Sequence, residues 1–114
     1  MTDVAVLLCT APLAGAAGKP GAHELARQLV DEGLCACVNV LPGVVSFFRW
    51  EGAVDRADEQ LLVVKTTRAA VAALTARLLE LHPYEVPEVL ELPVAGGHPG
   101  YLDWLRAAVR APSA

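Results

Sequence analysis

The sequence has little positive charge, few aromatic side chains and no apolar run long enough to cross a membrane. Its 114 residues carry 9 Lys and Arg against 13 Asp and Glu, a formal net charge of −4, without a basic cluster. This balance argues against nucleic acid and anionic membranes as partners. The longest charge-free runs, 4–18 and 34–48, are shorter than the roughly 20 apolar residues of a membrane helix, and each contains Pro. We therefore expect no membrane span.

The chain also lacks an even set of cysteines and a basic segment at its N-terminus. Its three cysteines are Cys9, Cys35 and Cys37. An odd number does not predict a disulfide framework, and reduced thiols are typical of cytosolic proteins. Residues 4–8 resemble the apolar core of a signal peptide, but Asp3 stands where such a peptide carries Lys or Arg. We expect a cytosolic protein.

What the chain has in excess is apolar residues. They make up 54% of it, and the mean hydropathy is +0.42, in a chain with the length of one domain. Without a membrane span, the excess is best interpreted as surface buried between subunits. We expect a single domain over 1–114, frayed at 111–114, that works as a homo-oligomer.

The apolar patterns predict secondary structure in the order β-α-β, β-α-β, followed by a terminal helix. Residues 4–10 form a buried strand, 37–50 and 61–67 form a long hairpin bent at Pro42 and Gly43, and 89–94 form a fourth strand. Helical spacing marks three buried stripes, which consist of Ala22, Leu25, Ala26, Leu29 and Val30; of Val71, Leu74, Leu78 and Leu81; and of Leu102, Leu105, Ala108 and Val109. This order is the split, ferredoxin-like α+β sandwich.

Two residues mark the ends of the predicted helices. Gly33 is placed to end the first helix, and Thr67 is placed to cap the second. Between the first strand and the first helix, residues 15–21 imitate a phosphate-binding loop. The match fails because Leu13 replaces the first Gly and Pro20 replaces the Ser or Thr that holds magnesium. We interpret 13–21 as a flexible surface loop.

Several residues are candidate metal ligands. Cys35 and Cys37 are predicted to share one face of a strand, where inert buried thiols are the favoured interpretation. The other candidate donors are Cys9, His82, Glu88 and His98. A thiolate with an imidazole selects copper or zinc over calcium or magnesium. The alternative is that Cys9 simply ends a core strand and His82 is an ordinary loop residue.

Lys65 closes the apolar run 61–64, so its stem is predicted to be buried and its ammonium to need a carboxylate. Glu59 and Glu88 are the candidates. Such a pair fits either a binding site or a structural ion pair. No catalytic set of residues is recognisable, and we expect neither enzymatic activity nor a required cofactor.

Several separate motifs, taken in order, resemble the CutA divalent-cation tolerance proteins. They are Cys-Val-Asn-Val-Leu-Pro-Gly at 37–43, Arg-Trp-Glu-Gly at 49–52, Val-Lys-Thr-Thr at 64–67, His-Pro-Tyr-Glu-Val-Pro-Glu at 82–88, and Tyr-Leu-Asp-Trp-Leu at 101–105. The likeness covers nearly the whole chain. It implies a ferredoxin-like subunit in a homotrimer similar to the PII signalling proteins, and a role in tolerance of copper and other divalent ions without established catalysis.

The resemblance also implies a soft-metal site. In members for which copper binding is proposed, the ligands correspond to Cys9, the neighbourhood of His82, and Glu88. This chain departs from the pattern at Leu81, where some members carry the first of two His residues, and at Phe48, where Tyr is common. The loop 13–21 is also longer than usual.

Finally, we predict a functional cleft between subunits. Its residues are polar or aromatic and lie on the long hairpin and the Pro-flanked loop; they are Asn39, Trp50, Glu59, Lys65, Tyr84 and Glu88. The alternative to metal binding is therefore a PII-like sensing or scaffold module that takes a small ligand or a protein partner in this cleft.

Overall fold

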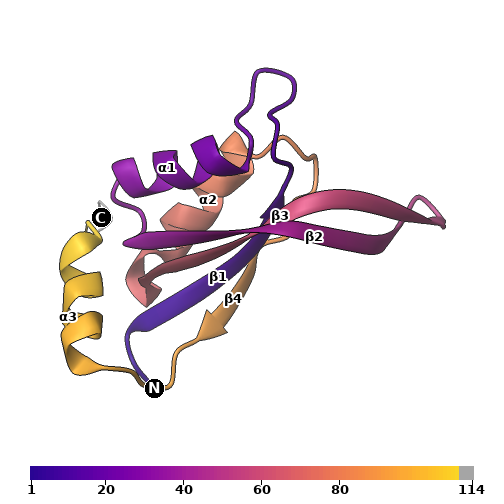
Figure 1. Ribbon diagram of the computed structural model, residues 1–114. Helices are drawn as coiled ribbons and strands as arrows, with labels where there is room; N and C mark the ends of the chain where they lie inside the picture. The colour runs from indigo at the N-terminus through magenta and orange to yellow at the C-terminus, as the bar shows by residue number, and fades with distance from the viewer. Residues whose placement is uncertain (111–114) are drawn as a thin grey trace.

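The computed structural model describes residues 1–110 and is drawn in Figure 1. The elements, in chain order, are β1 (Val4–Ala11), α1 (Ala22–Asp31), β2 (Cys37–Trp50), β3 (Ala53–Thr67), the 3-10 turn η1 (Arg68–Ala70), α2 (Val71–Leu81), β4 (Leu90–Pro93) and α3 (Pro99–Ala108). This is the predicted α+β, ferredoxin-like order with an added C-terminal helix. The predicted fraying of 111–114 lies outside the described residues.

The four strands form one antiparallel sheet in the order β2-β3-β1-β4. Helices α1 and α2 lie on one side of this sheet (Figure 1). Because side chains alternate along a strand, every second residue of β1 and β3 points towards these helices. The buried core between them includes Leu7, Cys9, Leu25, Leu29, Leu62, Val64, Leu74 and Leu78. In the described part of the chain, no helix is both long and apolar enough to span a membrane.

The other side of the sheet is not covered by α1 or α2, and we call part of it the open face. It consists of two rows of residues that lie opposite one another in the strand register: Leu92, Val6, Lys65 and Cys37, and then Leu90, Leu8, Val63 and Asn39. All eight remain at least partly exposed. Helix α3 contacts β1 and β3, and Val4 on this side is buried, yet the eight residues form a mostly apolar surface that α1 and α2 leave exposed.

Strands β2 and β3 continue as a hairpin that extends well beyond the body of the molecule (Figure 1). With the hairpin included, the chain measures 44 × 28 × 24 Å. The register shifts between Leu41 and Val44, where Gly43 has φ +77°, so Pro42 and Gly43 form the predicted bulge. The chain reverses at Glu51 and Gly52. The return strand begins at Ala53 and not at the predicted 61, because its polar first half pairs with β2 as fully as its apolar second half.

Some predicted details are wrong. Val30 is 39% exposed, since it lies about 80° round the helix from Ala22, at the flank of the buried stripe. The Thr67 side chain makes no capping hydrogen bond; the Arg68 N–H donates to the Asp3 carbonyl at 2.7 Å instead. In α3 only Leu105 is buried. Strand β4 covers 90–93, two residues fewer than predicted. The helix end at Gly33 is confirmed by its φ of +74°.

Candidate functional site

His82 lies at the end of α2, and both of its ring nitrogens have partners. Nε2 is 2.8 Å from the carbonyl oxygen of Thr10, and the backbone N–H of Tyr84 donates to Nδ1 at 3.0 Å. A carbonyl oxygen only accepts, so Nε2 carries the proton and Nδ1 accepts. Pro83 ends the helix here, since the residue before a proline is driven to extended geometry. The neutral imidazole therefore ties the loop after α2 to the end of β1.

The surroundings of His82 favour this neutral form. Burial lowers the pKa of His82 below its ordinary value of 6.5, and the positive charge of Lys19 acts in the same direction. The Thr10 carbonyl and the carboxylate of Glu59 oppose the shift without cancelling it. Since the lone pair of Nδ1 accepts a hydrogen bond and Nε2 is protonated, the ring offers no free donor atom to a metal ion.

Tyr84 connects the same loop to β3. Its hydroxyl donates to Oε2 of Glu59 at 2.9 Å, and its ring lies 4.8 Å from the imidazole of His82 between centroids. Glu59 is only 7% exposed. Burial and the bond to Glu59 together raise the pKa of the Tyr84 hydroxyl to about 12, so it stays protonated as a donor. The loop is thereby held at two points, one on β1 and one on β3.

Cys9 is fully buried near the end of β1. Burial, and then the nearby carboxylates of Glu88 and Glu59, raise the pKa of its thiol to about 12. The structure thus gathers Cys9, Glu59, Tyr84 and Glu88 with His82 around one end of the sheet. The thiolate that a soft metal needs is disfavoured there.

The residues do not fit the implied copper site within one chain. Among residues 1–110, no three His, Cys, Asp or Glu side chains are close enough together to hold a metal ion. His82 has no free lone pair, Cys9 is a buried thiol, and Leu81 has no donor where some family members have a first His. His98, the other predicted donor, is exposed at the start of α3.

The predicted cleft residues fall into separate groups in one chain. Asn39 and Lys65 lie on the open face, and Trp50 lies at the end of the hairpin with 44% exposure. In the described part of the chain, Lys65 has no carboxylate within 4.0 Å, so the predicted pair with Glu59 or Glu88 does not form within one subunit. A single chain does not bring the six predicted cleft residues together.

The prediction that Cys35 and Cys37 share a face is wrong. Strand β2 begins only at Cys37, and Cys35 precedes it with its side chain in the helix-covered core. Val38 packs against that core, so Cys37 points to the open face. Burial, and then the neighbouring Cys37, raise the pKa of the Cys35 thiol to about 12, in agreement with an inert buried thiol.

The loop that imitates a phosphate site is an exposed small hairpin. Ala16 and Lys19 exchange two backbone hydrogen bonds of 3.1 and 2.9 Å across a turn at Ala17 and Gly18. Both turn residues have positive φ, +53° and +77°. Its backbone groups are thus used within the turn, which supports the interpretation as a surface loop.

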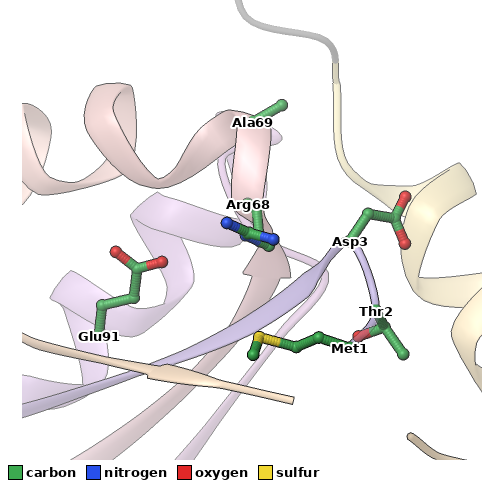
Figure 2. Close-up of a pocket in the computed structure, with 6 residues that line it drawn as sticks. All are labelled: Met1, Thr2, Asp3, Arg68, Ala69 and Glu91. Atoms are coloured by element: carbon green, nitrogen blue, oxygen red, sulfur yellow. The ribbon is translucent and has the colours of Figure 1, made fainter. Parts of the chain in front are cut away.

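Sequence reasoning missed a surface hollow at the opposite end of β1, shown in Figure 2. Its volume is about 550 Å³, and its lining residues are Met1, Thr2, Asp3, Arg68, Ala69 and Glu91. Arg68 lies between Glu91 and Asp3 in this view. The hollow contains none of the predicted site residues. Its only sequence signal is an exposed Arg that follows the strand β3.

The fold and the site loop define the class of this protein. A four-stranded antiparallel sheet with two helices on one face, a projecting β2–β3 hairpin and a loop anchored beside β1 is the architecture of PII-like subunits. A PII-like protein CutA from Nostoc has the same fold, with a TM-score of 0.84 and 30% identity over 95% of this chain and 99% of that one.

A family model described as "CutA1 divalent ion tolerance protein" matches residues 7–108, and the chain belongs to this family. A divalent-cation tolerance protein CutA from Thermus thermophilus is 52% identical over 85 residues, which are 75% of this chain and 82% of the relative. A second, from Pectobacterium atrosepticum, is 40% identical over 110 residues and 96% of each chain. The structure of a Thermus thermophilus divalent cation tolerance protein superimposes with a TM-score of 0.83 at 44% identity, over 94% of this chain and 99% of that one.

Proposed function

We propose that this chain acts in divalent-cation tolerance as a homotrimeric, PII-like sensing module, and that its ligand cleft lies between subunits. Membership of the CutA1 family supports the physiological role. The observation that carries the rest is the uncovered open face together with the projecting hairpin. We further propose that the protein is not an enzyme and needs no resident cofactor.

The exposed apolar surface supports self-association. On the hairpin, Phe47 is 69% exposed and Val54 is 67% exposed; on the edge strand β4, Leu90 is 55% exposed. Strands β2 and β4 are both sheet edges, and an edge without cover invites pairing with another chain. Surfaces this apolar are characteristic of protein interfaces. Other copies of the same chain account for the cover without any further partner.

The proposed cleft combines residues that one chain keeps apart. Glu59, Tyr84 and Glu88 lie beside the end of β1, while Asn39 and Lys65 lie on the open face. A neighbouring subunit packed on the open face would bring the first group of one chain towards the second group of another. Polar groups that converge on apolar walls are typical of ligand sites.

Sedimentation equilibrium tests the trimer directly. We expect a mass of three times 12.0 kDa, maintained on dilution to micromolar concentration. The physical reason is that the open face and the hairpin expose enough apolar surface to favour association over the free monomer. A stable monomer of 12.0 kDa under these conditions would contradict the proposed function.

Copper binding by Cys9 and Glu88, with a further ligand from a neighbouring chain, is the second candidate. The closeness of the Glu88 and Glu59 carboxylates to the Cys9 thiol favours it, because a cation there would meet two negative charges. If it is correct, Cys9→Ser weakens copper binding at least about tenfold. The matched control is Cys35→Ser, which alters an equally buried thiol away from both carboxylates. Equal copper binding by the wild type and both variants would support the sensing module instead.

We also propose a cytosolic location. Cys9, Cys35 and Cys37 are all free thiols, and reduced cysteines are typical of that compartment.

A further inference from the structure

Among the charged side chains of strand β3 that have no salt bridge within residues 1–110 are Lys65 and Glu59. Lys65 lies on the open face between Val6 and Cys37 in the register, and it is partly exposed. Glu59 is 7% exposed and accepts one hydrogen bond, from the Tyr84 hydroxyl to Oε2. Within the described residues, neither has a salt-bridge partner within 4.0 Å.

These two charges cannot neutralise one another within a subunit. They are six residues apart on the same strand, which is about 20 Å at 3.3 Å per residue. The two side chains together do not bridge that distance. Their spacing by an even number places both on the same side of β3, the side that α1 and α2 leave uncovered. Lys65 therefore lies where a neighbouring subunit would pack, and Glu59 lies beside that surface, with its carboxylate held at the end of β1 by the Tyr84 hydroxyl.

We propose that Lys65 of one subunit forms an ion pair with Glu59 of the next, so that each cleft is completed by two chains. This inference rests on the homotrimer proposed above. A cyclic, head-to-tail assembly brings two different patches of identical chains together. Three identical pairs would then form around the trimer.

The cost of burying a charge is the reason for the pair. Covering the open face removes the Lys65 ammonium from water, and an unpaired buried charge is strongly unfavourable. The partner must be a carboxylate that water does not already satisfy. Glu88 and Glu91 are exposed, whereas Glu59 is buried and keeps Oε1 free of hydrogen-bond partners.

The position of Glu59 also suits a contact between subunits. Its register partner is Val44, directly after the bulge, so Glu59 lies where the hairpin leaves the body of the molecule. A neighbour that packs beside the projecting hairpin meets this region first. Tyr84 acts as a positioning residue, because its hydroxyl fixes the direction of the carboxylate.

A double-mutant cycle in the full-length protein tests the pair. Each of the variants Lys65→Met and Glu59→Gln is expected to raise the concentration at which half the trimer dissociates by about tenfold or more, since each leaves one charge without its partner. The trimer of the double variant should dissociate no more readily than the trimer of the less stable single variant. The control combines Lys65→Met with Glu88→Gln, whose effects should multiply independently.

Charge reversal provides a second measurement if a neutral variant fails to fold. Lys65→Glu and Glu59→Lys should each abolish the trimer, and the combined variant should restore it. Independent effects of Lys65 and Glu59 in an intact trimer, or coupling of Lys65 to Glu88, would overturn the ion pair while leaving the trimer standing. A monomeric wild type would overturn the proposed function and the pair together.

Discussion

Replacing Leu8 with Glu is expected to leave a folded monomer in place of the trimer. Leu8 lies at the centre of the open face, with Leu90 on one side and Val63 on the other. In a single chain it is partly exposed, so a carboxylate there reaches water. Packed against a neighbour, the same carboxylate is desolvated at a cost of several kcal/mol, and this cost recurs in each subunit. Association is therefore lost before folding.

Sedimentation equilibrium measures the mass, and far-ultraviolet circular dichroism verifies that the chain is folded. The matched control is Leu79→Glu, because Leu79 is exposed on α2, on the other side of the sheet. It adds the same charge without touching the open face and should keep the wild-type mass. A Leu8→Glu variant that remains a trimer of wild-type thermal stability would show that the subunits associate through another surface.

Replacing His82 with Ala is expected to lower the free energy of unfolding by about 2–4 kcal/mol at pH 8. The change removes a buried ring, and it leaves the Thr10 carbonyl and the Tyr84 N–H without partners. The control is His98→Ala, which removes an exposed imidazole and should have little effect. Denaturant unfolding at a fixed protein concentration measures both variants, since the stability of an oligomer depends on concentration.

The same substitution has a defined pH dependence. The pKa of His82 is lowered in the folded chain. As the pH falls below 6.5, the imidazole is therefore protonated in the unfolded chain before it is protonated in the folded chain. The stability that comes from the neutral ring is complete above pH 6.5 and decreases as the pH falls towards the folded pKa. The difference between wild type and His82→Ala should therefore narrow between pH 7 and pH 5. A difference that stays constant would mean that His82 is not held in its neutral form.

The copper site illustrates how far sequence reasoning reaches. The sequence predicts Cys9, His82 and Glu88 as soft-metal donors, and the fold does place Cys9 and Glu88 near one another beside β1. The fold also shows that both ring nitrogens of His82 form hydrogen bonds within the chain. No spacing in the sequence indicates this, because the acceptor of the Nε2 proton is the carbonyl of Thr10, 72 residues away.

The cysteine pair and Lys65 are similar cases. Alternation along a strand predicts one face for Cys35 and Cys37 only if the strand includes both, and β2 begins at the second. Lys65 is partly exposed in one chain, and the pairing of its ammonium with a carboxylate stays a prediction. The distance along β3 excludes a pair with Glu59 within one chain, so the proposed pair depends on assembly.

The sequence by itself determined the order of the elements, the bent hairpin, the buried stripes of α1 and α2, and the family. These features are local or periodic: Pro42 and Gly43 interrupt a strand wherever it lies, and a helical stripe needs a core whatever its neighbours are. Only the tertiary structure decided which side of the sheet remains open, which lone pairs of His82 are in use, and which charges lack a partner. Those outcomes depend on contacts between segments far apart in the chain, and a linear sequence does not specify such contacts one residue at a time.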